Sequence, residues 1–440
     1  MTKTEFLTNL FTCFNKQEID YYVVGEYANL PVDCGDSDID IYINPKHYSQ
    51  VTEIIENLRR KNEIVLASFY KNPYESYIRL LTCKWGVQID LQKPFLHKCQ
   101  SYYNPNFFID NIYVHNGIVR VLNTCEGYYV GFLKELIHTG QIKEKYVIGF
   151  IEEFKINPKR HHEIAKCLGK HTLELFERYN TKEELLCHTK ELRASIISYI
   201  HSWDYIKRLY FFIYNLRRVL LPPGYVIVVL GTDGSGKSTI INRITPKLDE
   251  GFHHGVVYNH LRPNAIPELG VLLGKKEKQD ASIVNTDPHA LKQSGFFGSI
   301  IRWGYYMIDY TFGYMKVVWP QIRTKSKVYI FDRYYYDYYI DQKRSRISLP
   351  NWVIRMGEFF VPKPDLIICL GGNPKKVFER KPETSMEEVV RQTEALKAFC
   401  SNRDNAVWVD TTCPLELSVN SAMRAIVDMM SKRFEKSYIK

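Results

Sequence analysis

The sequence predicts an α/β protein built from three regions, each with its own residue pattern. Residues 1–122 mix strand-like and helical apolar patterns, which is typical of an α+β domain. Residues 123–220 are rich in helix formers and lack strand alternation, so a helical accessory region is expected. Over 221–440 strands alternate with helical stretches, which predicts a mainly parallel sheet covered by helices. Its strands are expected at 225–230, 255–260, 327–332, 365–370 and 406–410.

Composition places the chain among ordinary globular proteins. Of its 440 residues, 45% are hydrophobic and 25% are charged, and the net charge is +10. This moderate positive charge suits phosphorylated ligands, and it also suits nucleic acid or an anionic membrane surface. The ten cysteines are irregularly spaced without a C-x-x-C pair, which favours reduced thiols in a cytosol and argues against structural zinc.

No part of the sequence reads as a signal peptide or a membrane span. The first residues include an acid and no long apolar run, so no signal peptide is expected. Residues 299–320 are the most apolar, but Arg302, Asp309 and Lys316 recur there every seven residues and so lie near one face of a helix. We expect a mostly buried helix at this position, no membrane span, and a cytoplasmic protein.

The N-terminal region begins with a helix and continues with strands. Apolar residues at helical spacing predict the helix: Phe6, Leu7, Leu10, Phe11 and Phe14. Strand-like runs follow at 21–25, 38–43 and 87–91. Asp38 and Asp40 are two residues apart and share a face of their strand, where a neighbouring strand could add Asp90. Three such carboxylates can hold two Mg²⁺ ions, which stabilise the attacking and leaving oxygens in nucleotidyl transfer.

A phosphate-binding loop follows the strand at 225–230, shortly after the chain-breaking Leu-Pro-Pro-Gly at 221–224. The pattern G-x-x-x-x-G-K-[ST] and its neighbours give the expected nucleotide-binding residues: Gly231, Asp233, Gly234, Ser235, Gly236, Lys237, Ser238 and Thr239. The glycines let backbone N–H groups point at phosphate oxygens, Lys237 neutralises their charge, and Ser238 offers a hydroxyl to Mg²⁺. A nucleoside triphosphate with Mg²⁺ is therefore expected to bind here.

Polar side chains follow two later strands of the same region. Asp332 and Arg333 end the strand at 327–332, at the edge of an open sheet where ligands gather. Asp332 could hold Mg²⁺ through water or take a proton from the acceptor, and Arg333 could clamp a phosphate as a catalytic side chain. Arg262 follows the strand at 255–260, where it either binds the acceptor substrate or is an ordinary loop residue.

Two further features allow both a functional and a plain structural interpretation. Asp233, inside the phosphate loop, either contacts an acceptor hydroxyl or caps the following helix. Arg380, Lys381 and Arg391 lie in a polar helical stretch after the strand at 365–370. They form either a mobile basic flap that covers the triphosphate and excludes water, with Arg380 as a catalytic residue, or a solvated charged helix face.

Taken together, these motifs make residues 225–440 resemble the thymidylate kinase family of P-loop nucleoside monophosphate kinases. The resemblance rests on the phosphate loop, on Asp332-Arg333-Tyr334 and on the segment around Arg380. The His-Leu-Arg-Pro and Asp-Arg-Tyr-Tyr-Tyr-Asp stretches are similar to thymidylate-kinase-like proteins often associated with bacterial surface-polysaccharide genes. The family implies a five-stranded parallel sheet, ATP and Mg²⁺, a phosphorylated acceptor and a homodimer. The Arg-Glu-Pro-Gly stretch of thymidylate kinases is reduced here to Arg262-Pro263, which leaves open a different nucleotide or a sugar phosphate as acceptor.

Residues 1–122 resemble the nucleotidyltransferase superfamily of DNA polymerase β and the aminoglycoside nucleotidyltransferases. The run Tyr22-Val-Val-Gly25 and the three aspartates carry this resemblance. It implies that Asp38, Asp40 and Asp90 bind metal and that the helices from 124 onward form an accessory domain. The superfamily has Ser or Gly directly after the glycine, whereas Glu26 stands here, and a carboxylate facing phosphates repels them.

Three functions fit these patterns. The first is an ATP- and Mg²⁺-dependent kinase that acts on a nucleoside monophosphate or another phosphorylated small molecule. The second is a bifunctional nucleotidyltransferase and kinase that activates a sugar or polysaccharide precursor, and the third is a nucleotide-binding regulatory protein. Nucleic acid is the least favoured partner, because the 32 tyrosines do not interleave with a basic patch in a recognisable module.

Overall fold

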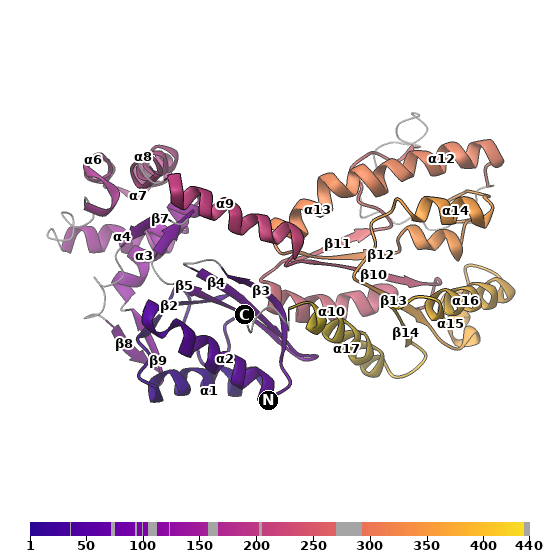
Figure 1. The fold of residues 1–440 in the computed structure, drawn as a ribbon, viewed down its shortest axis with the longest axis horizontal. Coiled ribbons are helices and arrows are strands. Elements are labelled where there is room, and N and C mark those ends of the chain that lie inside the picture. Colours follow the sequence, from indigo (N-terminus) through magenta and orange to yellow (C-terminus); the bar gives the residue numbers. More distant parts are fainter. Residues whose placement is uncertain are drawn as a thin grey trace. The chain divides into compact units, whose positions relative to one another are not determined.

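A computed structural model describes residues 1–35, 37–71, 75–92, 95–98, 100–103, 112–122, 124–156, 166–201, 205–269 and 293–434. By its internal contacts the chain divides into two units, Met1–Arg217 and Arg218–Ile439. Both combine helices with sheets, so the predicted mixed α/β class is confirmed (Figure 1). Within the described ranges, no helix is both long enough and apolar enough to cross a membrane.

The N-terminal unit contains a seven-stranded mixed sheet in the order β3-β4-β5-β2-β1-β9-β8. Its strands are β1 (Tyr21–Val24), β2 (Ile39–Ile43), β3 (Val65–Lys71), β4 (Glu75–Leu81), β5 (Gly86–Gln92), β8 (Ile112–His115) and β9 (Val119–Leu122). A separate hairpin pairs β6 (Phe95–His97) with β7 (Gln100–Tyr103). The three predicted strands are confirmed as β1, β2 and β5, and β2 lies parallel to β5 at the centre of the sheet.

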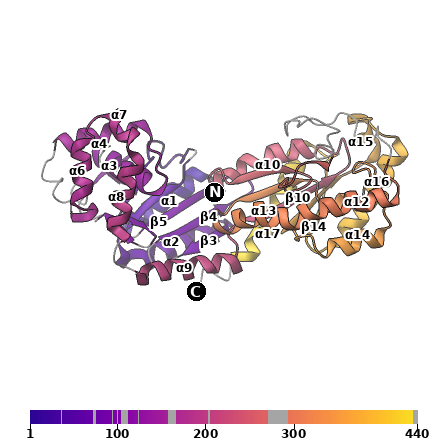
Figure 2. The ribbon, with the colours of Figure 1, turned by 90° about the horizontal axis from the view of Figure 1, so that it is seen from above.

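Two helices flank this sheet, and the other helices of this part of the chain form a separate helical region. The first two are α1 (Lys3–Lys16) and α2 (Tyr48–Lys61), which follows the short turn η1 (Pro45–His47). All five apolar residues of the predicted first helix are buried on α1, so that prediction is confirmed. The helical region contains α3 (Thr124–His138), α4 (Glu144–Ile156), α6 (Lys170–Arg178), α7 (Lys182–Cys187), α8 (Thr189–His201) and α9 (Tyr205–Leu220). Figure 2 shows α3, α4, α6, α7 and α8 gathered together, and the stacked rings of Phe132 and Phe150 lie in their core.

The C-terminal unit contains a five-stranded, fully parallel sheet in the order β11-β12-β10-β13-β14. Its strands are β10 (Tyr225–Gly231), β11 (Val256–His260), β12 (Val328–Asp332), β13 (Leu366–Gly371) and β14 (Ala406–Asp410). They coincide closely with the five predicted strands, so the parallel sheet is confirmed. Strand β10 is central, and the chain crosses from one side of it to the other between β12 and β13. Ligands of open parallel sheets bind at the carboxyl edge of such a crossover.

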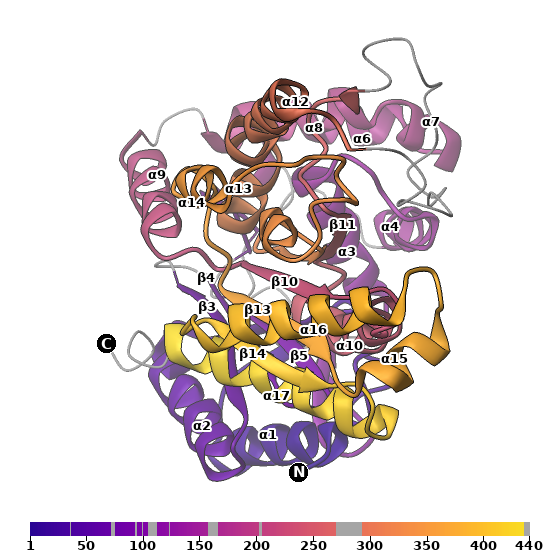
Figure 3. The same cartoon turned by 90° about the vertical axis from the view of Figure 1, so that its right-hand side faces the viewer.

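Helices cover both faces of this parallel sheet. They are α10 (Lys237–Phe252), α12 (Phe296–Ile308), α13 (Tyr314–Thr324), α14 (Asn351–Glu358), α15 (Pro374–Arg380), α16 (Met386–Ser401) and α17 (Leu415–Phe434). Alternate residues of β10, Val226, Val228 and Leu230, share a core with α13 and α16. Helices α10 and α17 contact each other and the sheet, and both α16 and α17 contact β14 (Figure 3).

The single buried helix predicted at 299–320 is wrong in two respects. The segment forms α12 and α13 joined by a π-helical turn, η3 (Asp309–Gly313). Asp309 is fully buried, whereas Phe312 is 70% exposed. A π turn holds more residues than an α turn, so the side chains after it face other directions than a continuous α-helix would give them. A prediction based on 3.6 residues per turn therefore fails across this segment.

Candidate functional site

The predicted phosphate loop connects the central strand β10 to α10 through an arrangement that only glycine permits. Gly234 and Gly236 have φ of 79° and 82°, in the left-handed region. A Cβ atom on Gly234 would lie 2.6 Å from the Val377 carbonyl oxygen, and one on Gly231 would lie 2.4 Å from Ser235 Oγ. Among the described residues no side chain caps α10, so the N–H groups of its first turn remain available to an anion. Ser238 and Thr239 are exposed in that turn.

Lys237 is the first residue of α10 and folds back over the loop. Its Nζ donates hydrogen bonds of 2.9 Å to the carbonyl oxygens of Gly231 and Thr232. The side chain is buried, and burial together with the nearby charge of Arg333 lowers the pKa of Lys237 to about 7. Within the described residues, the hydrogen bonds of this buried group go to two neutral carbonyls, so its ammonium form gains stability from an added negative charge.

Asp332 ends β12 beside the loop, in register with Val229 of the central strand. Its Oδ2 accepts a 3.2 Å hydrogen bond from the Tyr258 hydroxyl, and His260 Nδ1 lies 3.7 Å away. Burial acts to raise the pKa of Asp332, but His260 and the charge of Lys237 outweigh it, so the pKa lies below its usual value. Asp332 is therefore ionised at neutral pH.

Three buried oxygens around the loop lack a hydrogen-bond partner in the part of the chain that the structure describes. They are Asp332 Oδ1, Thr232 Oγ1 and Ser235 Oγ. A buried polar atom without a partner costs about 1–3 kcal/mol, so native proteins rarely retain one without a use. The site thus offers carboxylate and hydroxyl oxygens, which suit Mg²⁺, next to N–H groups and an ammonium, which suit phosphate.

Arg333 and a second arginine converge on Asp233. Arg333 Nη2 donates to Asp233 Oδ1 at 2.8 Å, and Arg344 Nη1 donates to Asp233 Oδ2 at 2.5 Å. Arg333 Nη1 also binds Asp337 Oδ1 at 2.8 Å. Burial raises the pKa of Asp233, but the charges of Arg333, Lys237 and Arg344 overcome this and hold it well below its usual range. Asp233 therefore ties the loop to two cations, which differs from the helix-capping interpretation.

Arg333 has a strained backbone, and Arg344 was not predicted from the sequence. Arg333 has φ of 69°, which a side chain other than glycine seldom adopts. Such strain is often retained at functional sites. Arg344 lies 111 residues from Asp233 in the sequence and belongs to no motif, so sequence reasoning missed it. Asp337 could have been found, because it stands four residues after Arg333 in the quoted Asp-Arg-Tyr stretch.

Arg262 is buried directly after β11 and is fixed by Asp309. Its Nη1 donates to Asp309 Oδ2 at 2.9 Å, and its guanidinium lies over the Tyr306 ring at 4.7 Å. Asp309 also accepts the backbone N–H groups of Asn264 and Ala265 at 3.0 and 2.8 Å. Within the described ranges, no hydrogen bond or ion pair joins Arg262 to the phosphate loop. Its role toward an acceptor stays a prediction.

Of the predicted flap residues, Arg380 ends α15, Lys381 follows it, and Arg391 lies on α16. Arg380 Nη2 donates to the Thr411 carbonyl at 2.9 Å, and Lys381 Nζ pairs with Glu383 at 2.9 Å. The main chain here lies against the loop, since a Cβ on Gly234 would be 2.6 Å from the Val377 carbonyl oxygen and 3.5 Å from Lys381 N. Arg391, further along, pairs with Glu388. The main chain of the segment thus reaches the phosphate loop, while the described contacts of both basic side chains lie elsewhere.

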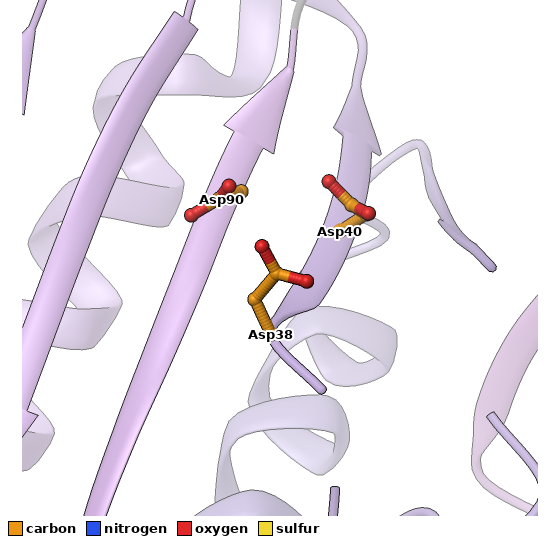
Figure 4. A group of neighbouring side chains, drawn as sticks. All are labelled: Asp38, Asp40 and Asp90. Carbon is orange, nitrogen blue, oxygen red and sulfur yellow. The ribbon is translucent and has the colours of Figure 1, made fainter. Parts of the chain in front are cut away.

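The three N-terminal aspartates meet at one place in their own unit. Asp40 on β2 is in register with Asp90 on the parallel strand β5, and Asp38 directly precedes β2 (Figure 4). One carboxylate oxygen from each lies within 4.8 Å of the others. Burial, followed by the charges of Asp38 and Asp40, raises the pKa of Asp90 well above its usual value. This concentration of negative charge favours a bound cation.

Two lysines of the helical region form ion pairs with acidic residues of this N-terminal site. Lys134 of α3 forms an ion pair with Asp40, which also accepts a 2.6 Å hydrogen bond from Gln92. Lys145 of α4 forms an ion pair with Glu26, the residue that departs from the superfamily pattern. The negative charge of Glu26 is thereby offset. Sequence reasoning missed both lysines because they lie far along the chain from the motif, in a region without a recognisable pattern.

No model of a known protein family matches this chain, and no curated protein matches it either. Function is therefore inferred from two groups of side chains. One is the phosphate loop with Asp332, Arg333 and Arg344 in the C-terminal unit. The other is the aspartate cluster in the N-terminal unit.

Proposed function

We propose that the C-terminal unit is an ATP- and Mg²⁺-dependent kinase of the thymidylate kinase type, which phosphorylates a phosphorylated small molecule. One observation carries this proposal: buried Lys237 and Asp332 Oδ1, which has no hydrogen-bond partner among the described residues, flank a glycine loop at the carboxyl edge of two adjacent parallel strands. Phosphoryl transfer depends mainly on positioning and on stabilising charge, and this arrangement provides both.

The chain's own residues divide the work as follows. The loop N–H groups and Lys237 bind the donor phosphates, and Lys237 exchanges its two carbonyl partners for phosphate oxygens. Ser238 and Asp332 would hold Mg²⁺, which neutralises charge on the phosphates. Arg333, steadied by Asp233, orients the acceptor phosphate. Arg262 contributes to acceptor binding, and the Arg380–Lys381 segment excludes water from the loop.

The acceptor is identified by measuring ADP formation from Mg²⁺-ATP with purified full-length protein. The panel contains dTMP, the other nucleoside monophosphates and common sugar phosphates. ADP formation that requires one class of acceptor supports the kinase and names its substrate. ATP binding without turnover across the panel would instead favour a regulatory, nucleotide-binding role. The homodimer implied by the resemblance stays a prediction.

Nucleotide binding is expected to take up a proton at about pH 8. In the free protein the pKa of Lys237 is about 7, so the amine is largely neutral above that pH. Bound phosphates favour the ammonium form and raise this pKa, so affinity falls as pH rises through 7 and beyond. Calorimetry in two buffers of different ionisation enthalpy measures the uptake. A binding enthalpy that is identical in both buffers would contradict this assignment.

A second candidate activity is nucleotidyl transfer by the N-terminal unit. The observation that favours it is the ion pair of Glu26 with Lys145, which reduces the repulsion expected from the sequence, next to three clustered aspartates. The carboxylates suit Mg²⁺, and Lys134 forms an ion pair with Asp40, one of the three.

If this activity exists, pyrophosphate release from a nucleoside triphosphate should fall by about a hundredfold in Asp38→Ala and Asp40→Ala. The measurement uses all four nucleoside triphosphates with the same acceptor panel. Lys237→Ala is the control and should release pyrophosphate normally, because it alters only the other unit. Release that is absent from the wild-type protein, or unchanged in both aspartate variants, would rule the activity out.

A further inference from the structure

Helix α9 exposes an unusually apolar face. Eight of its large apolar side chains are between 47% and 84% exposed: Tyr205, Ile206, Leu209, Tyr210, Phe212, Ile213, Leu216 and Leu220. None of its described residues is buried. Large contiguous apolar patches on a protein surface mark sites of interaction with a partner or a membrane.

These exposed side chains form one continuous face of the helix. At about 100° per residue they span an arc of about 160°. The partly covered residues occupy the opposite side: Lys207, Phe211, Tyr214, Asn215, Arg218 and Val219. The more polar side of the helix is thus its less exposed side, and the more apolar side is exposed, which is the reverse of a helix that belongs to a protein core.

The charge of α9 is entirely positive. Lys207, Arg208, Arg217 and Arg218 lie within it, and no Asp or Glu occurs from residue 205 to residue 232. Arg208 and Arg217 are exposed, and helical spacing places Arg208 just outside one edge of the apolar face and Arg217 just inside the other. Arginines close to the border of an apolar face can extend their guanidinium groups to lipid phosphates, while their carbon stems stay against the apolar surface.

We propose that α9 lies flat on an anionic membrane surface, with its apolar face in the boundary between headgroups and acyl chains. The breadth of the face, the flanking arginines and the absence of acidic residues match the physical requirements of interfacial helices. A second copy of the chain fits less well, because helix pairing uses a narrower apolar seam and two copies would bring like charges together. This inference does not depend on the proposed kinase activity.

Vesicle co-sedimentation of the full-length protein tests the proposal. One set of vesicles is phosphatidylcholine alone, and the other contains about one third phosphatidylglycerol. The bound fraction should be at least about tenfold greater with the anionic vesicles, and it should fall as salt rises. Leu209→Glu combined with Phe212→Glu should abolish binding, and Arg208→Gln combined with Arg217→Gln should weaken it.

A matched control is Leu417→Glu, which changes an apolar side chain on α17 that is 58% exposed and should bind vesicles like the wild type. Circular dichroism and thermal unfolding establish that each variant is folded. The proposal is overturned if the wild type stays in solution with both vesicle types, or if the double glutamate variant binds as well as the wild type. It is also overturned if the wild-type protein is a dimer that does not bind lipid and the double glutamate variant is a monomer.

Discussion

Lys237→Ala is expected to lower the rate of phosphoryl transfer by on the order of a thousandfold. The side chain is buried at the start of α10, where its charge is poorly screened by water. Its removal leaves the transferring phosphate without the one ammonium that the loop provides. The measurement is ADP formation at saturating Mg²⁺-ATP and acceptor, together with the ATP dissociation constant.

Arg243→Ala is the matched control, because Arg243 is an exposed cation on the same helix. It should leave the rate within about twofold of the wild type, as surface substitutions usually do. A Lys237→Ala variant that retains wild-type turnover would end the kinase assignment. If both variants lose activity equally, the effect would come from helix α10 rather than from the ammonium.

Asp332→Asn is expected to reduce turnover by about a hundredfold or more. The substitution keeps the size of the side chain but removes the negative charge next to Lys237. Because the carboxylate would hold Mg²⁺, the concentration of Mg²⁺ needed for half-maximal rate should also rise. Binding of ATP without Mg²⁺ should weaken little or even improve, since one negative charge near the phosphates is gone.

Asp410→Asn serves as its control, because Asp410 ends β14 at the same edge of the sheet but is exposed. It should leave the Mg²⁺ dependence unchanged. An Asp332→Asn variant with normal turnover and normal Mg²⁺ dependence would contradict the role given to Asp332. Loss of turnover without a change in Mg²⁺ dependence would indicate that Asp332 accepts a proton instead.

The parts of the fold that depend on local pattern could be predicted from the sequence. The five parallel strands and the phosphate loop are examples, because short apolar runs and glycines act on their immediate neighbours. The approach of Asp90 to Asp38 and Asp40 was also predicted, since the period of a strand fixes which side chains share a face.

The contacts that complete each site could not be predicted in this way. Arg344, Lys134 and Lys145 reach their carboxylate partners from distant parts of the chain, and a single charged residue in a helix or loop carries no signal for its partner. The full burial of Asp309 and its contact with Arg262 were missed for a different reason. Asp309 is buried by a π turn, and Gly313 leaves room for it, since a Cβ there would lie 2.3 Å from Asp309 Oδ1.

Transfer of the γ-phosphate of labelled ATP to an acceptor is the most direct test of the kinase proposal. The wild-type protein and Lys237→Ala are compared with Mg²⁺ against nucleoside monophosphates and sugar phosphates, and the products are separated and identified. The account predicts label in one class of phosphorylated acceptor with the wild type and none with the variant. Label that appears only in inorganic phosphate, or equally with both proteins, would contradict it.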